Sequence, residues 1–444
     1  MIRRVILSIA AASFAAVVQL PGQDAAVAGK IESANIDLPT ALRLAGANNL
    51  DVRLARENLA EAQAAYVSTR EQFFPWIVPA VAANRHSGNV QAFNGPISEA
   101  QKQSLAAGVA LNAQLDLGDA IYQNLASRQL VRASTAMLAA QQRQTVYFVA
   151  AAYFDLSAAK GAVSAAAHAA QIAAEQLSQT SRAADAGLIF KGDVYRVETA
   201  YERGELNRRQ LREQQRILAA RLAELLHMDH AVELIPTEGD MAPLSLVAES
   251  ADLGELIGHA LAARPEMDAA TARVAAAKEN SRGATYAPLV PSIGAQAGVG
   301  KLGGGAGDPP LTRDFSATHD YLLALSWRIG PGGLLDFGRQ HAAQAAERTG
   351  ILEKAKLDEQ IRREVVEHFE HLHSVADQVG LLRKTLASAE ETAKLSRERR
   401  LIGVGAVLED LLAEDELARS QRDYLTVVAE YNKAQYALRF STGD

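Results

Sequence analysis

The stretch GLIFKGDVYRVE, residues 187–198, is repeated in outline as GVGAVLEDLLAE at residues 403–414. The offset is 403 − 187 = 216 residues, about half of the 444-residue chain. Three further pairs occur in the same order: amphipathic segments that begin at Leu38 and Leu253, PWIVP (75–79) with PLVP (288–291), and LDLG (115–118) with LDFG (335–338). Four pairs in one order indicate a duplicated architecture, whose single copy cannot bury its own hydrophobic face.

The composition narrows the class of protein. Hydrophobic residues make up 48% of the chain but aromatic residues only 5%, which is typical of long, closely packed helices. The net charge of −7 provides no basic footprint for nucleic acid. The absence of cysteine excludes disulfides, thiolate metal sites, thiol nucleophiles and an N-terminal lipidated cysteine.

The N-terminus has the pattern of a secretory signal peptide. Arg3 and Arg4 precede an apolar stretch at 5–18, and AVA at 26–28 supplies a small-x-small cleavage pattern, so we predict a signal peptide over residues 1–28. The alternative is a short N-terminal membrane anchor. After residue 30 no window comes near 18 uninterrupted apolar residues, which predicts no transmembrane helix. An exported chain of this kind is periplasmic, secreted or an outer-membrane barrel.

Each half contains two segments in which apolar and polar residues alternate. They predict strands at about 76–86 and 103–116 in the first repeat (29–230), and at about 291–301 and 318–330 in the second (253–444). Turn-forming residues at 84–103 and 302–318 separate them, which predicts one β-hairpin per half. Strands of about ten residues are long enough to cross a bilayer when they are tilted.

Long helices are predicted to follow each hairpin. Residues 119 to about 184 and 339–400 contain no proline, and each stretch would span on the order of 95 Å. Ile361, Val365, Phe369 and Leu372 recur at spacings of three and four, as in a coiled-coil seam. Returning helices at 192–227 and 406–440 complete the helical parts, about 119–227 and 335–440, and residues 231–252 link the repeats.

Four strands cannot close a barrel, and an open sheet edge is not viable in lipid. If the hairpins are embedded in a membrane, the chain must therefore oligomerise, with eight strands from two chains or twelve from three.

This doubled order of helix, hairpin and long helix pair resembles the TolC-like outer-membrane efflux factors over residues 36–441. The resemblance implies a mainly α fold with a membrane β-barrel: a homotrimer with a twelve-stranded barrel in the outer-membrane lipid, continuous with a helical periplasmic tunnel. It also implies a passive exit duct of a tripartite efflux or type I secretion system, joined to an inner-membrane transporter through a periplasmic adaptor. Two departures are visible. The acylated cysteine of many relatives is missing, and KLSRERR at 394–400 stands where some relatives carry an acidic ring, with Glu390 and Glu391 farther back.

The alternation assigns faces to the predicted strands. We expect a lipid-facing set consisting of Leu105, Val109, Leu111, Leu115, Tyr321, Leu323, Leu325, Trp327 and Ile329. We expect a lumen-facing set consisting of Asn112, Gln114, Ser326 and Arg328.

The glycine motifs predict the turns between outgoing and returning helices, far from the membrane. The simplest interpretation is an ordinary glycine after a helix end, exposed to solvent. Largely on the resemblance, we expect these turns also to be adaptor-docking and gate tips, formed by Arg182, Gly187, Leu188, Asp193, Arg399, Arg400, Gly403, Val404 and Glu409.

Other motifs point to no chemistry. His368, His371 and His373 lie among glutamates but lack the HExxH arrangement, so a solvated helix face is expected. GGGAG at 303–307 lacks a following Lys-Ser or Lys-Thr and is expected to be a flexible surface loop, and HMDH at 227–230 a boundary after a helix. We therefore predict no catalytic residue, cofactor or metal. The competing hypothesis is a soluble periplasmic coiled-coil adaptor or scaffold, and an exported enzyme has no supporting site.

Overall fold

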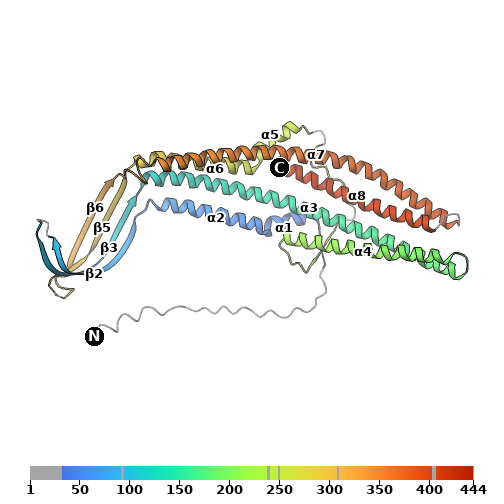
Figure 1. Cartoon of the computed structure of the whole chain (residues 1–444), viewed down its shortest axis with the longest axis horizontal. Coiled ribbons are helices and arrows are strands. Elements are labelled where there is room, and N and C mark those ends of the chain that lie inside the picture. The colour runs from blue at the N-terminus through green and yellow to red at the C-terminus, as the bar shows by residue number, and fades with distance from the viewer. Residues whose placement is uncertain are drawn as a thin grey trace.

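The computed structural model describes residues 33–91, 95–237, 241–248, 251–307, 310–402 and 407–443. The molecule is elongated, with a sheet at one end and the far ends of two long helix pairs at the other (Figure 1). The expected signal peptide, residues 1–28, lies outside the described residues, as do Gly403 and Val404 of the second expected tip.

Helices form most of the chain and occur in the same order in both halves. Their first residues are set by local capping: Asp37 Oδ1 accepts the Thr40 amide (2.9 Å), Asn49 accepts the Asp51 amide (2.9 Å), and Asp252 accepts the Glu255 amide (3.0 Å). The first half contains α1 (Leu38–Asn48), α2 (Leu50–Glu71), α3 (Leu117–Asp185) and α4 (Lys191–Leu225). The second contains α5 (Leu253–Ala263), α6 (Pro265–Tyr286), the 3-10 turn η1 (Ala287–Leu289), α7 (Phe337–Leu401) and α8 (Val407–Thr442).

One four-stranded antiparallel sheet joins the two hairpins. Its order is β2-β3-β5-β6, with β2 at Trp76–Gln91, β3 at Ile97–Leu115, β5 at Ser292–Ala306 and β6 at Ser316–Ser326. Near mid-length of the helical body, β1 (Ser33–Ile36) pairs in parallel with β4 (Glu233–Pro236), so part of the expected linker is a strand.

The hairpins extend beyond the predicted strands. Pairing of β2 with β3 continues to Gln91 and Ile97, which leaves a much shorter connection than the expected loop at 84–103. The expectation of a flexible loop at 303–307 is wrong for residues 303–306, which lie in β5. A Cβ atom on Gly304 would lie 2.1 Å from the Gln103 carbonyl oxygen, so only glycine permits this pairing. At the other end β6 stops at Ser326, three residues before Ile329.

Helix α3 is shared by both halves, because it contacts α1, α2 and α4 as well as α6 and α8. Ala126, Ala133 and Ala140 are buried at seven-residue spacing, as in a coiled-coil seam. By length and composition alone, α3 is also apolar enough to cross a membrane. The expectation from sequence missed this, because it rested on a run of 18 uninterrupted apolar residues. Helix α3 packs on five other helices, and 39% of its most apolar window is buried within the chain.

Two main cores stabilise the helical body. The first is centred on Tyr153, Leu156 and Leu222, where α3 and α4 meet α1 and the β1–β4 pair. The second is centred on Ile361, Val365 and Leu438, where α7 and α8 meet α5. Each half therefore has a core of its own, and α3 joins the two.

Candidate functional site

The sheet has a largely apolar face and an opposite face that is richer in polar and small residues, although it also carries Trp76 and Leu322; we call the second one the polar face. Ile77, Leu111, Ala297 and Tyr321 are successive partners across the four strands, and side chains of direct cross-strand partners share a face. Because side chains alternate along each strand, the same face carries the following expected residues: Leu105, Val109, Leu111, Leu115, Tyr321, Leu323 and Leu325. Tyr321 and Leu323 are 76% and 75% exposed. This face is an apolar surface that nothing in the described chain covers.

The opposite face carries Asn112, which pairs with Gln296, and also Gln114 and Ser326. Glycine is frequent on this face, at Gly108, Gly298 and Gly300. Trp327, Arg328 and Ile329 follow the end of β6, and the Trp327 indole donates to the Leu289 carbonyl (3.3 Å). The structure therefore brings most of the two expected sets together on opposite faces, while these three residues lie outside the sheet.

Both edges of the sheet are open. In the order β2-β3-β5-β6, the outer strands β2 and β6 each have one neighbour, and their remaining backbone groups point away from the sheet. In water such an edge invites pairing with another chain, and in lipid it leaves hydrogen-bonding groups unsatisfied. To pair these backbone groups, each outer strand would need a neighbouring strand from another chain.

The two LD(L/F)G motifs join the sheet to the long helices. Asp336 Oδ1 accepts the Arg339 amide (3.0 Å) and Oδ2 accepts the Gly332 amide (2.8 Å), and these bonds lower the pKa of that carboxyl. In the first motif, Asp116 instead contacts the Ser292 hydroxyl, and a Cβ on Gly118 would lie 2.2 Å from the Ala287 carbonyl oxygen. The junction is thus tightly built from both repeats.

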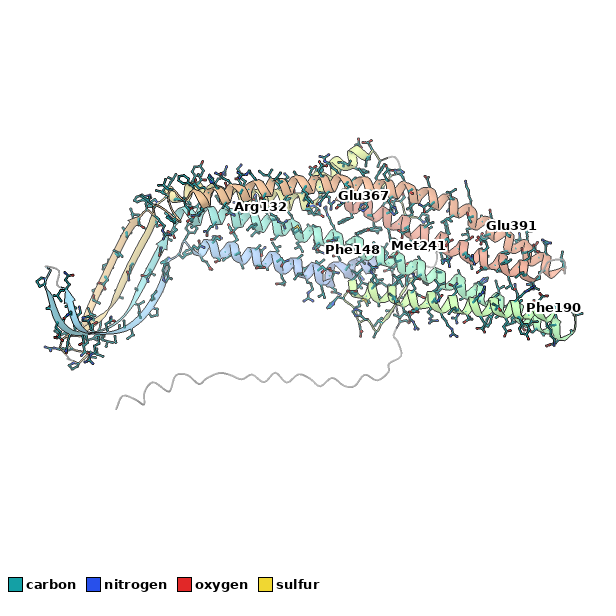
Figure 2. All side chains as sticks on the ribbon, viewed as in Figure 1. Arg132, Phe148, Phe190, Met241, Glu367 and Glu391 are labelled. Carbon is teal, nitrogen blue, oxygen red and sulfur yellow. The ribbon has the colours of Figure 1, made fainter. Side chains whose placement is uncertain are left out.

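The turn that connects α3 to α4 lies entirely within the residues that the structure describes. Gly187 has φ +73, and the Leu188 amide donates to the Ala183 carbonyl (2.9 Å), which closes α3 with a left-handed residue. Leu188 and Phe190 are 77% and 75% exposed, and Figure 2 shows Phe190 at the extreme end of the helical body. This turn presents apolar side chains to solvent.

Beside the second turn, an ion-pair network links the halves. Arg399 pairs with Glu409 (2.6 Å), and Arg400 pairs with Asp410 (2.6 Å). Arg400 also donates to Gln179 Oε1 (2.9 Å), and Gln176 donates to Asp410 Oδ2 (2.6 Å). Since both glutamines belong to α3, the adjoining ends of α7 and α8 are tied to the outgoing helix of the first repeat.

Sequence reasoning found only part of this network. It named Arg399, Arg400 and Glu409 as charges of the tip, and the structure engages all three in ion pairs, with Arg400 largely buried. It missed Asp410, which is 1% exposed, and Gln176. The two lie 234 residues apart, and nothing in one sequence marks them as partners.

A groove runs between α4 and α8 near the turns, with α3 as its floor. Apolar, basic and acidic side chains line it from both repeats, and Arg419 in its wall pairs with Asp415 (2.6 Å). The groove exists because α4 and α8 make few contacts with each other there. The walls include Tyr195, Arg203, Leu408, Leu412, Arg419 and Arg422.

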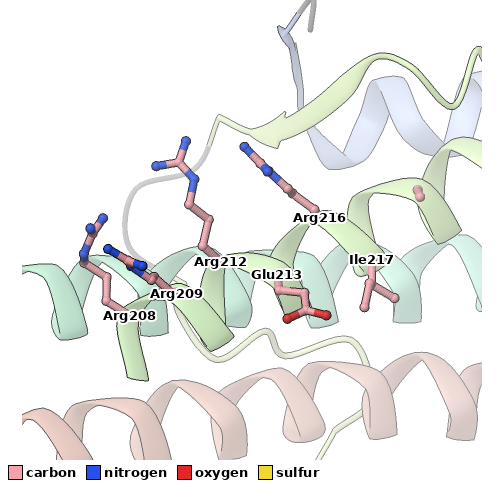
Figure 3. A pocket seen from close by; sticks show the side chains of 7 residues that line it. Arg208, Arg209, Arg212, Glu213, Arg216 and Ile217 are labelled. Carbon is pink, nitrogen blue, oxygen red and sulfur yellow. The ribbon is translucent and has the colours of Figure 1, made fainter. Parts of the chain in front are cut away.

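A row of arginines lies on the outer face of α4, near β4 (Figure 3). Arg208 pairs with Glu205 (2.8 Å), Arg216 approaches Glu233 (3.9 Å), and Glu213 lies within the row. Carboxylates therefore offset the charge of Arg208 and, at a greater distance, that of Arg216.

The histidines of α7 do not come together as a metal site. His371 and His373 are exposed, while His368 is half-buried beside Glu364 and Glu367, and burial lowers the His368 pKa. Within the described ranges no group of three or more His, Cys, Asp or Glu residues is arranged to hold a metal ion.

The sequence matches the outer membrane efflux protein family over residues 41–226 and 256–444. Among curated proteins, protein CyaE of Bordetella pertussis is 33% identical over 129 residues, which cover 29% of this chain and only 27% of that protein.

Among solved structures, the Campylobacter jejuni CmeC outer membrane channel has a TM-score of 0.78 at 14% identity, over 96% of this chain and 93% of that one. A membrane protein from Pseudomonas aeruginosa has a TM-score of 0.76 at 21% identity, over 91% and 93%. The open state of the Neisseria gonorrhoeae MtrE outer membrane channel has a TM-score of 0.67 at 20% identity, over 91% and 88%. At these identities the likeness establishes a shared fold.

Proposed function

Since the chain belongs to the outer membrane efflux protein family, the outer-membrane channel components of efflux and secretion systems, we propose that three copies form one passive exit duct. In this trimer the four strands of each copy contribute to a twelve-stranded barrel, and the helices continue it as a periplasmic tunnel. The observation that carries the proposal is the two-faced sheet with two open edges.

Trimerisation would satisfy both edges at once. The β2 edge of one copy would pair with the β6 edge of the next, which closes the sheet and leaves no backbone group unpaired in lipid. The apolar face would then contact lipid and the polar face would line the lumen. Strand β3 has 19 residues and β5 has 15, long enough to cross a bilayer when tilted.

The turns at the far end are proposed as gate and docking tips. The exposed Leu188 and Phe190 form an apolar contact surface for a periplasmic adaptor, which would connect the duct to an inner-membrane transporter. The groove between α4 and α8 beside the tip would provide a second contact surface, lined by both repeats. Opening would require the tip network around Arg400 and Asp410 to yield when the adaptor binds the splayed state more tightly.

Two measurements test the proposal. Native mass measurement in mild detergent should give three copies, whereas a stable dispersed monomer would contradict the shared barrel. Carbonate washing should leave the protein in the membrane fraction. Release into the wash would favour the alternative, a soluble periplasmic scaffold whose hairpins form a small β domain.

A separate experiment tests the tip. Gly187 occupies a left-handed position with open space around its Cβ direction, so Gly187→Val strains only the local backbone. We expect normal trimers with reduced export. Gly380→Val, which lies in α7 with nothing within 4 Å of its Cβ position, is the matched control. Export by the Gly187 variant at the control level would remove the support for a docking or gating tip.

A further inference from the structure

One acidic side chain lies in the middle of the sheet's polar face. Asp320 belongs to a row in which Val78, Ala110, Gly298 and Asp320 are successive partners across the four strands. The three partners are uncharged and small or apolar, and the glycine directly opposite carries no side chain. Asp320 is exposed, and nothing in its row covers the carboxylate.

The neighbouring rows on this face are also uncharged. One side has Trp76, Asn112, Gln296 and Leu322, and the other has Ala80, Gly108, Gly300 and Thr318. Within the four strands, Asp320 is the one acidic residue on this face and Lys102 is the one lysine or arginine.

Lys102 does not offset this charge. It lies eight residues along β3 from Ala110, the partner of Asp320's row, which is about 27 Å at roughly 3.4 Å per residue. Arg328 follows β6 eight residues beyond Asp320, at a comparable separation along the chain. Both separations exceed the screening length of about 8 Å at physiological ionic strength. Lys301 lies on the opposite, apolar face.

We propose that Asp320 sets the charge preference of the duct for its permeating ions and cargo. The inference rests on the proposed trimer, in which three copies of Asp320 lie at one depth and project into the lumen. A ring of carboxylates raises the local concentration of cations and lowers that of anions. The duct would therefore favour positively charged solutes at this level of the barrel.

The experiment measures ion selectivity of purified trimers in planar lipid bilayers. Reversal potentials in a KCl gradient give the permeability ratio of K⁺ to Cl⁻. Each substitution is measured in two backgrounds: the otherwise unmodified chain, and a chain with Arg400→Ala, which lacks the tip ion pair with Asp410. Asp320→Asn should lower this ratio, and Asp320→Lys should lower it further. Asp320→Glu, which keeps the charge, should retain it.

Salt supplies a second signature. The shift caused by Asp320→Asn should be clear at 0.1 M salt, where the screening length is about 10 Å, and should shrink at 1 M, where it is about 3 Å. The matched control is Asp314→Asn, because Asp314 precedes β6, has an 83% exposed side chain and already faces Arg313.

The outcomes separate the two proposals. An unchanged permeability ratio in Asp320→Asn trimers, or an equal shift in Asp314→Asn trimers, would overturn the role of Asp320. If the Asn variant fails to assemble, Asp320→Ser and Asp320→Glu are compared instead. Equal permeability ratios for these two variants would also overturn the role of Asp320. Failure of the unmodified chain to form trimers would overturn the proposed function itself.

Discussion

Asp119 and Arg339 occupy the same position in the two repeats, three residues after the aspartates of the LD(L/F)G motifs, and they form an ion pair with each other (2.5 Å). Asp119 lies in the first turn of α3 and Arg339 in the first turn of α7. One repeat thus supplies the anion and the other the cation, so the duplicated helices are joined where they leave the sheet.

This pair predicts a rescue by charge exchange. Both side chains are about one-third exposed, so Asp119→Asn alone should cost about 0.2–1 kcal/mol of stability. The double variant Asp119→Arg with Arg339→Asp should recover most of the loss, because it preserves the pair and moves the favourable acidic residue to the other helix N-terminus. A double-mutant cycle on thermal unfolding measures the coupling. Additive losses would show that the pair contributes nothing.

A buried arginine should matter more. Arg264 is 5% exposed and pairs with Glu364 (2.6 Å) and Glu266 (3.0 Å), while its guanidinium lies 5.4 Å from the Phe440 ring centre. Arg264→Ala leaves both carboxylates without their cation, so we expect a loss of about 2–4 kcal/mol, reduced by the partial exposure of Glu364. Chemical unfolding followed by circular dichroism measures it. Arg363→Ala, which removes an exposed pair with Glu367, should cost less than about 1 kcal/mol.

The half-buried His368 predicts a pH effect. Burial lowers its pKa below the ordinary histidine value of about 6.5, against the opposing effect of Glu364 and Glu367. The unfolded chain therefore takes up the proton first as the pH falls. The stability that this neutral histidine provides is present above pH 6.5 and is lost as the pH falls through the lower folded-state pKa.

The measurement is the thermal midpoint between pH 7.5 and 5. His368→Gln should flatten the decline at low pH, whereas His371→Gln, at an exposed position on the same helix, should keep it. A decline of equal slope in the His368 variant would assign the effect to other groups.

The faces of the sheet predict different responses to charge. Leu323→Arg places a cation on the apolar face, where a charge near the bilayer midplane costs roughly 2–4 kcal/mol. Ser326→Arg places the same side chain on the polar face. We expect fewer trimers from the first variant than from the second, measured by native mass after extraction. Equal yields would argue against a barrel with these faces.

The tip network predicts a change in conductance. Arg400→Ala leaves the buried Asp410 with a neutral partner, Gln176, in place of its cation, so the second turn should separate from α3. Bilayer conductance should rise while trimer mass is unchanged. Arg196→Ala removes an exposed pair with Asp193 at the other turn and should leave conductance unaffected. Equal conductance of the two variants would mean that the network does not hold the gate.

The sequence predicted the helical part of the fold well, because prolines, caps and apolar spacing are local signals. The long helices α3 and α7 begin within two residues of the predicted 119 and 339. The hairpins were harder to delimit, since Gly303 and Gly304 usually indicate a loop but here allow β5 to lie close to β3 and to the segment before β6. The part of the tip network that was missed is Gln176 and Asp410, because only the packing of α3 on α8 brings these two residues together.

The open strand edges also govern the order of events during synthesis. Strand β3 pairs with its neighbour β2 across a short connection, but its partner β5 is made about half a chain later, so closing that long loop delays the sheet. Even a complete chain exposes two unpaired edges and an apolar face, and in the proposed trimer these would be covered only when two other copies arrive. A lone chain with such exposed edges is prone to aggregation, so the proposed assembly would have to couple insertion to the meeting of the three copies.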